Sequence, residues 1–147
     1  MSKKHASIQD IRNHIFKNKS VDALRLWGKI LSRLTLHKEH NIAYTYFTQK
    51  EIEEHGVTEE ELDGVANLLN HLNEGDAIMV IRERKEGGIK ASMRTTKNHV
   101  DVSIIAQTFG GGGHKKAAGF SLEHSLEAAI EHIFDTLTVK QVAFVKQ

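Results

Sequence analysis

A run of glycines in the last third of the chain is the strongest candidate for chemistry. Segment 109–120 reads Phe-Gly-Gly-Gly-Gly-His-Lys-Lys-Ala-Ala-Gly-Phe and holds five of the eleven glycines. Consecutive glycines can point several backbone N–H groups at one concavity, which makes an anion nest, and no side chain blocks a phosphate or ribose. His114 and Lys115 lie at the rim, where they can donate to phosphate oxygens. The predicted binding residues of this segment are Gly111, Gly112, Gly113, His114 and Lys115.

The alternative interpretation of the same run is a flexible glycine linker. Linkers are flanked by serine and other polar residues, whereas this run directly follows an apolar segment that Asp101 can cap as a helix. It also leads straight into Ala-Ala-Gly-Phe, whose small residues suit close backbone packing. Both observations favour a binding loop.

Arg94 is the second candidate. Alternation along a strand at 89–96 places Lys90, Ser92 and Arg94 on one face, from which a guanidinium presents a planar fork to a phosphate or carboxylate. An isolated arginine on a strand is more often a solvated surface charge. The prediction that Arg94 binds substrate therefore depends on the presence of the glycine run in the same chain.

Neither the histidines nor the carboxylates form a recognised catalytic or metal-binding motif. His37 with His40 and His124 with His132 have helical spacing, but neither pair has a carboxylate in a pattern such as His-Glu-x-x-His. The absence of cysteine excludes disulfides, thiolate zinc sites and a cysteine nucleophile. There is also no Gly-x-Ser-x-Gly elbow and no P-loop. We predict no catalytic and no metal-binding residue in this chain.

The elements that must position these residues alternate between helix and strand. Apolar spacing and capping residues predict helices over 21–36, 48–56, 58–75, 101–110 and 126–137. The helix that begins at Thr58 is expected to bury Leu62, Val65, Leu68, Leu69 and Leu72. Strands are predicted over 41–47, 77–81 and 117–122, and a hairpin joins 82–85 to 89–96. The expected fold class is α+β, a small mixed β-sheet with helices packed on it.

Size and charge narrow the function classes. A chain of 147 residues with 27% charged residues fits one globular domain, and a net charge of +1 does not indicate general nucleic-acid binding. The start lacks the apolar core of a signal peptide and no apolar run reaches about 20 residues, so a cytoplasmic location without a membrane span is expected. A homodimer fits the base rate, but no feature identifies its face.

Three segments resemble the DHHA1 domain, the C-terminal half of DHH-superfamily phosphoesterases. They are 89–95, 100–106 and 109–120, and the string Gly-Gly-Gly-His-x-x-Ala-Ala-Gly is the most specific of them. The resemblance covers roughly 21–137 and is greatest to the group of oligoribonucleases and phosphoadenosine-phosphate phosphatases, with RecJ-like nucleases and exopolyphosphatase-like proteins nearby. It implies that Arg94 and the loop 111–114 hold the phosphate or terminal nucleotide of a short RNA, short DNA or nucleoside phosphate.

The resemblance also implies that hydrolysis is done by a separate DHH domain, whose Asp-His-His string and other residues hold two manganese ions. This sequence contains no Asp-His-His, and its aspartates are scattered singly. We therefore expect the chain alone to be inactive and to need a DHH domain upstream or in trans. The expected organisation is a basic arm or leader at 1–20, a connector helix at 21–40 and the DHHA1 substrate-binding domain at 41–147.

A non-catalytic RNA-binding module is the rival hypothesis. The segment also resembles the C-terminal domain of alanyl-tRNA synthetases, which contacts tRNA. The histidine directly after the glycines suits the phosphoesterase group better. A KH-type Gly-x-x-Gly clamp would need a helix after the loop, whereas 117–122 is strand-like.

Overall fold

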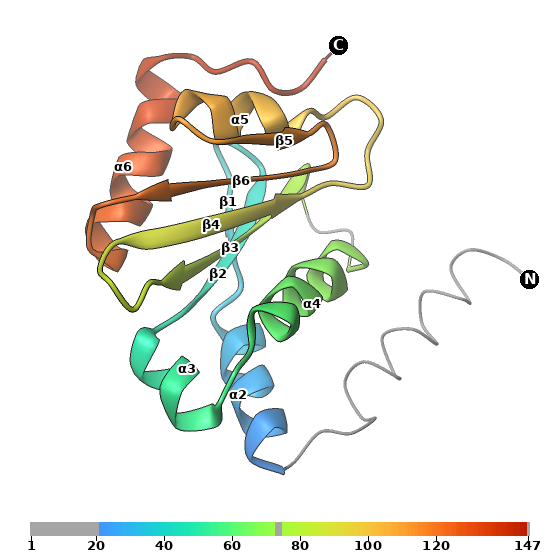
Figure 1. Ribbon diagram of the computed structural model, residues 1–147. Helices are drawn as coiled ribbons and strands as arrows, with labels where there is room; N and C mark the ends of the chain where they lie inside the picture. The colour runs from blue at the N-terminus through green and yellow to red at the C-terminus, as the bar shows by residue number, and fades with distance from the viewer. Residues whose placement is uncertain (1–20, 73–74, 147) are drawn as a thin grey trace, which may run out of the picture.

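One six-stranded sheet carries five helices in the computed structural model, which describes residues 21–72 and 75–146 (Figure 1). In chain order the elements are α2 (Val21–Ser32), β1 (Thr35–His37), β2 (Ile42–Phe47), α3 (Gln49–His55), α4 (Glu59–Asn70), β3 (Ala77–Glu83), β4 (Ile89–Arg94), α5 (Val102–Thr108), β5 (Gly112–His114), β6 (Ala117–Leu122) and α6 (Leu126–Val139). The strand order is β1-β2-β3-β4-β6-β5, and β2 with β3 is the parallel pair among antiparallel ones. The predicted α+β class with a mixed sheet is confirmed.

Helices cover both faces of the sheet. In Figure 1, α5 and α6 lie on one side, and α2, α3 and α4 lie on the other. The central strand β3 serves both cores: Met79 and Ile81 pack toward α5 and α6, whereas Ile78 and Val80 pack toward α2 and α4. The predicted continuous apolar run is therefore a strand buried on both faces.

Capping residues set the helix boundaries as the sequence predicted. The Thr48 side chain accepts from the backbone N–H of Glu51, and Glu51 Oε1 accepts in return from the backbone N–H of Thr48 at 3.0 Å. Helix α3 ends at Gly56 in the left-handed conformation, with φ 59°. Asp101 caps α5 by accepting from Ser103 N at 3.0 Å. The element types between 41 and 139 match the predictions, apart from the edge strand β5, which was predicted as a loop.

Two predicted helices are shorter than expected. Helix α2 ends at Ser32, because the following residues of β1 pair antiparallel with β2; the predicted connector helix through residue 40 is wrong. Helix α4 ends at Asn70, so Leu72 lies beyond it and is 43% exposed rather than buried. The predicted basic arm at 1–20 lies outside the described residues. Among the helices that are described, none has the length and apolar character to span a membrane.

Candidate functional site

The glycine run forms the edge of the sheet. Residues 112–114 are β5, which pairs antiparallel with β6 across a two-residue turn made by Lys115 and Lys116. Gly112 and Gly113 therefore belong to an edge strand rather than to a linker or the expected loop, whereas Gly110 and Gly111 precede that strand. All three residues of β5 are exposed.

Strand register brings Arg94 and His114 onto one row. Arg94 of β4 is paired with Ala117 of β6, and Ala117 is paired with His114 of β5. Directly opposed residues of neighbouring strands point to the same face, so the guanidinium and the imidazole belong to one face of the sheet. Two strand spacings separate their backbones, roughly 10 Å, and only the methyl group of Ala117 lies between.

The neighbouring row on the same face is made of small residues. Ser92 is paired with Gly119, and Gly119 is paired with Gly112. A Cβ built on Gly112 would meet no other atom within 4 Å, so the face is open above this glycine. The two rows together form a shallow floor, flanked by one arginine and one histidine, on which a flat or anionic ligand can lie.

Two of the predicted binding glycines, Gly111 and Gly113, have a structural role. A Cβ on Gly111 would lie 2.2 Å from Gly119 O, and one on Gly113 would lie 2.6 Å from Ala118 Cα. Both glycines are needed for close packing of β5 on β6. The N–H of Gly111 is also bonded to Ala106 O at 2.8 Å, at the end of α5. The expected anion nest of consecutive glycine N–H groups is therefore not formed by Gly111.

Arg94 differs in its partners from the other arginines of the sheet and its surroundings. Its Nε donates to Asn67 Oδ1 of α4 at 3.0 Å, and its Nη1 donates to Met93 O at 2.9 Å. Ion pairs with carboxylates are made by three other arginines, namely Arg33 with Glu51, Arg82 with Glu59, and Arg84 with Glu86 and Glu123. Within the described residues Arg94 has no such ion pair, so no described carboxylate neutralises its positive charge.

The two turn lysines are held at the edge of this face. Lys115 Nζ donates to the backbone carbonyl of Asn98, and Lys116 Nζ donates to Asn98 Oδ1 at 2.8 Å. Asn98 carries no charge, so these hydrogen bonds do not neutralise either ammonium group. The predicted residue Lys115 is therefore placed at the rim rather than on the floor beside Arg94.

The histidine pairs that were considered for metal binding take part in ring stacking. His37 stacks on Phe134 with ring centroids 4.0 Å apart, and His124 stacks on His132 at 4.5 Å. His37 lies in β1 rather than in a helix. Across residues 21–72 and 75–146, no group of three or more His, Asp or Glu side chains could hold a metal ion.

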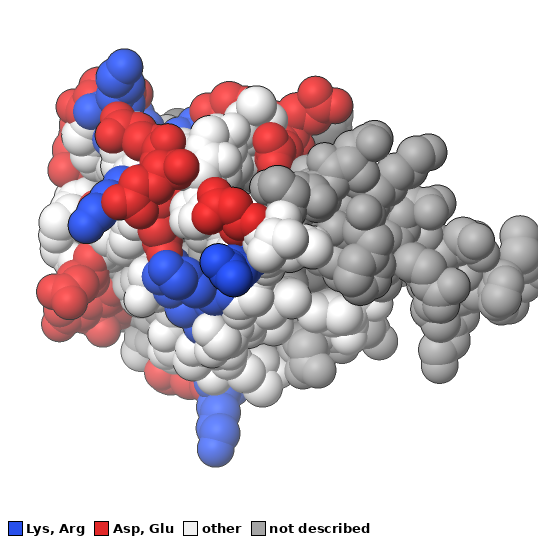
Figure 2. Space-filling model, turned by 90° about the horizontal axis from the view of Figure 1, so that it is seen from below, with Lys and Arg blue, Asp and Glu red and all other residues white. Residues whose placement is uncertain are grey.

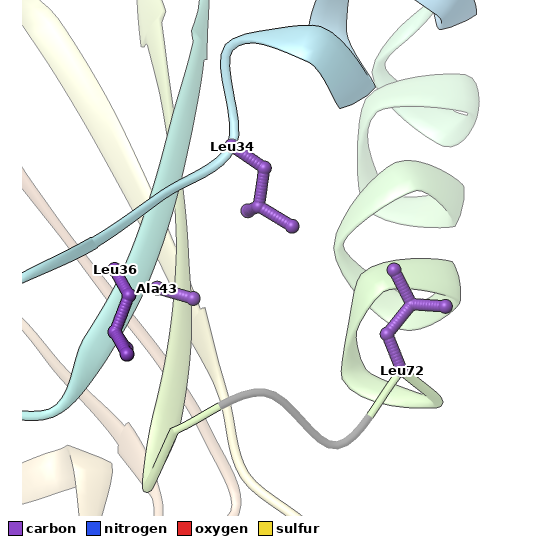
Figure 3. Close-up of a pocket in the computed structure, with 4 residues that line it drawn as sticks. All are labelled: Leu34, Leu36, Ala43 and Leu72. Carbon is purple, nitrogen blue, oxygen red and sulfur yellow. The ribbon is translucent and has the colours of Figure 1, made fainter.

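A hollow lies at the opposite end of the sheet. It is lined by Leu34, Leu36 and Ala43, with Leu72 facing them from beyond α4 (Figure 3). These side chains offer no hydrogen-bond donor to an anion, so the pocket does not compete with the Arg94 face as a phosphate site. Seen from the side of α2, α3 and α4, the described residues carry separate groups of acidic and basic side chains and no continuous basic surface (Figure 2).

Comparison with known proteins identifies the family of this chain. The DHHA1 domain family model matches residues 39–139. The bifunctional oligoribonuclease and PAP phosphatase NrnA of Thermus thermophilus is 30% identical over 114 residues, which are 77% of this chain and 33% of that enzyme. Oligoribonuclease NrnB of Bacillus subtilis is 50% identical over 36 residues, 24% of this chain and 9% of that protein.

A solved structure shows the same fold. The crystal structure of an exopolyphosphatase-related protein from Bacteroides fragilis superposes with a TM-score of 0.71 at 26% identity, over 91% of this chain and 39% of that one. The chain thus corresponds to between a third and two fifths of these two relatives. The family match spans well over half of the chain, and it includes both Arg94 and the glycine strand. This chain therefore belongs to the DHHA1 domain family of the DHH-superfamily phosphoesterases.

Proposed function

We propose that this domain holds the phosphate of a short oligonucleotide or nucleoside phosphate for hydrolysis by a DHH catalytic domain. The observation that carries the proposal is the row that joins Arg94 to His114 across a floor of small residues. An arginine without a carboxylate partner, beside an open strand face, suits an anionic ligand. The two similar curated proteins are oligoribonucleases, which agrees with such a substrate class.

Each residue of the face has a distinct part in the proposal. Arg94 donates charge-assisted hydrogen bonds to phosphate oxygens, and His114 donates from the opposite side of the row. Gly112 leaves room for the ribose or phosphate to approach the backbone of β5. Lys115 and Lys116, held at the rim by Asn98, raise the local positive potential.

The chemistry of hydrolysis is assigned to the partner domain. Two manganese ions in a DHH domain would activate the water that attacks the phosphorus and would stabilise the leaving oxygen. The described residues of this chain contain no cluster that fits such ions, so the steps assigned to it are binding and orientation alone. The rival RNA-binding module of the alanyl-tRNA synthetase type is less well supported, because both similar curated proteins are oligoribonucleases. A KH-type clamp is disfavoured for another reason, because strand β6 rather than a helix follows the glycines.

Arg94→Gln should weaken the binding of a nucleoside 3′,5′-bisphosphate by about tenfold or more, since a charge-assisted bidentate contact contributes about 1.5–3 kcal/mol. Arg94→Lys should recover only part of the affinity, because an ammonium lacks the planar fork. The measurement is an NMR titration of the isotope-labelled chain, with the unphosphorylated nucleoside as the reference ligand. Wild-type dissociation constants should lie between about 10 μM and 1 mM, as expected of a single phosphate contact.

Arg25→Gln is the matched control, because Arg25 is an exposed arginine on α2 and its loss changes the net charge equally. It should leave the dissociation constant within about twofold, because an exposed surface charge is largely screened by salt. Equal affinities for Arg94→Gln and wild type would refute the proposed phosphate site.

A further inference from the structure

Two nitrogen atoms of the Arg94 guanidinium have acceptors within the protein. Asn67 Oδ1 accepts from Nε at 3.0 Å, and Met93 O accepts from Nη1 at 2.9 Å. We propose that Asn67 is a positioning residue that fixes the guanidinium so that its Nη1–Nη2 end faces an anionic ligand. This inference rests on the proposed function, in which Arg94 binds phosphate.

The geometry of arginine explains the consequence of this contact. A guanidinium can offer an anion either the side fork of Nε and Nη2 or the end fork of Nη1 and Nη2. Asn67 occupies Nε, which removes the side fork. Nη1 has a second N–H beyond the one bonded to Met93, and Nη2 makes no hydrogen bond with the described residues. The end fork is therefore the one left for a phosphate.

The type of acceptor matters as much as its position. A carboxylate at residue 67 would hold Nε equally well, but it would neutralise the charge, as Glu59 does for Arg82. An amide oxygen holds the group and leaves its charge available to the ligand. Asn67 thus combines fixed orientation with full charge, which lowers the entropic cost of binding.

Helix α4 provides a rigid base for this contact. On either side of Asn67, the helix buries Ala66 and Leu68, which are 0% and 4% exposed. Asn67 itself is exposed, so its substitution creates no cavity and should not affect folding. Its contact with Arg94 bridges 27 positions in the sequence, and no local pattern predicts it.

The test compares Asn67→Ala and Asn67→Asp with wild type. Asn67→Ala should weaken bisphosphate binding about three- to tenfold, as expected for one lost hydrogen bond, and should speed hydrogen exchange at Arg94 Nε in the ligand-free protein. Asn67→Asp should keep the slow Nε exchange but still weaken binding, because its carboxylate neutralises the guanidinium. Gln107→Ala, which removes an exposed amide from α5 across the sheet, is the control and should change neither quantity.

A double-mutant cycle separates positioning from direct contact. In the Arg94→Gln background, Asn67→Ala should have no further effect, because there is no guanidinium left to orient. An independent loss of affinity in that background, or unchanged Nε exchange in Asn67→Ala, would overturn the positioning role. Normal affinity in Asn67→Ala combined with weak binding in Arg94→Gln would overturn this inference and leave the phosphate site intact. Normal affinity in Arg94→Gln would overturn both.

Discussion

Gly113→Ala should destabilise the chain by about 2–4 kcal/mol, the range expected when backbone strain and a steric clash combine. Gly113 has a φ of 144°, a backbone angle that residues other than glycine rarely adopt. The added methyl carbon would also lie 2.6 Å from Ala118 Cα and 2.7 Å from Ala117 O, and backbone atoms cannot move aside as a flexible side chain can. Thermal or urea unfolding of the two proteins measures the difference.

Gly112→Ala is the matched variant one residue earlier. Its φ is not in the left-handed region and its Cβ would meet nothing within 4 Å, so stability should change by less than about 0.5 kcal/mol. Its methyl group would nevertheless project from the floor shared with Arg94, and bisphosphate affinity should fall about tenfold through steric exclusion.

The pair of glycine variants thus separates folding from binding within a single strand. Wild-type affinity in Gly112→Ala would show that the ligand does not lie on the floor of small residues. Wild-type stability in Gly113→Ala would show that β5 does not pack on β6 as closely as described.

Glu51→Gln should cost about 2–3 kcal/mol of stability, because it leaves the Arg33 guanidinium without its charged partner. The two side chains form two hydrogen bonds, at 2.8 Å and 2.6 Å, and Arg33 also donates to Tyr46 O and lies over the Tyr46 ring. Glu51 additionally accepts from the backbone N–H of Thr48. One carboxylate therefore ties the end of α2 to the start of α3, and a neutral amide keeps only one of its two acceptor oxygens and none of its charge.

The same pair predicts how stability depends on pH. The hydrogen bonds from Arg33 lower the pKa of Glu51 from 4.5 to about 2, against the opposing effect of burial, and the Thr48 bonds add to the decrease. Because the folded pKa lies below the unfolded one, the stabilisation is complete above pH 4.5 and is lost as the pH falls from 4.5 toward 2. Urea unfolding at several pH values should show a steeper loss over this range in wild type than in Glu51→Gln.

Glu54→Gln on the same helix is the control. Glu54 pairs with Lys50 at 3.9 Å, and the side chains are 56% and 83% exposed. Such a surface pair contributes only about 0.3–0.5 kcal/mol. An equally large loss of stability in Glu54→Gln and in Glu51→Gln would mean that the effect is common to carboxylates of helix α3. The role assigned to the Arg33–Glu51 pair would then be wrong.

Local chemistry in the sequence determined most of the element boundaries. Thr48, Thr58 and Asp101 can each accept a backbone N–H from the first turn that follows them, and the structure has all three caps. The run at 77–81 is apolar at every position, which suits only an environment buried on both faces, and β3 has that environment. The specific string around 111–119 indicated the family, and the family match confirms it.

Contacts between distant segments decided the rest. The apolar stripe of α2 continues through Leu34, but the following residues form β1 instead. Pairing with β2 satisfies their backbone hydrogen bonds, which a longer helix would otherwise have to do. Leu72 has helical spacing with Leu68 and Leu69, yet the helix stops before it and leaves it exposed. No sequence pattern near Leu34 or Leu72 predicts where helices α2 and α4 end.

The candidate site shows the same division. The residue types of Arg94, His114 and the glycines were sufficient to select them from the sequence. Their placement on one row requires the strand order β4-β6-β5, and the partner of Arg94 comes from α4, 27 residues earlier. The sequence alone therefore determined which groups carry charge and conformational freedom, whereas only the tertiary structure decided which of them meet, since strand register and helix packing bring together atoms that are remote along the chain.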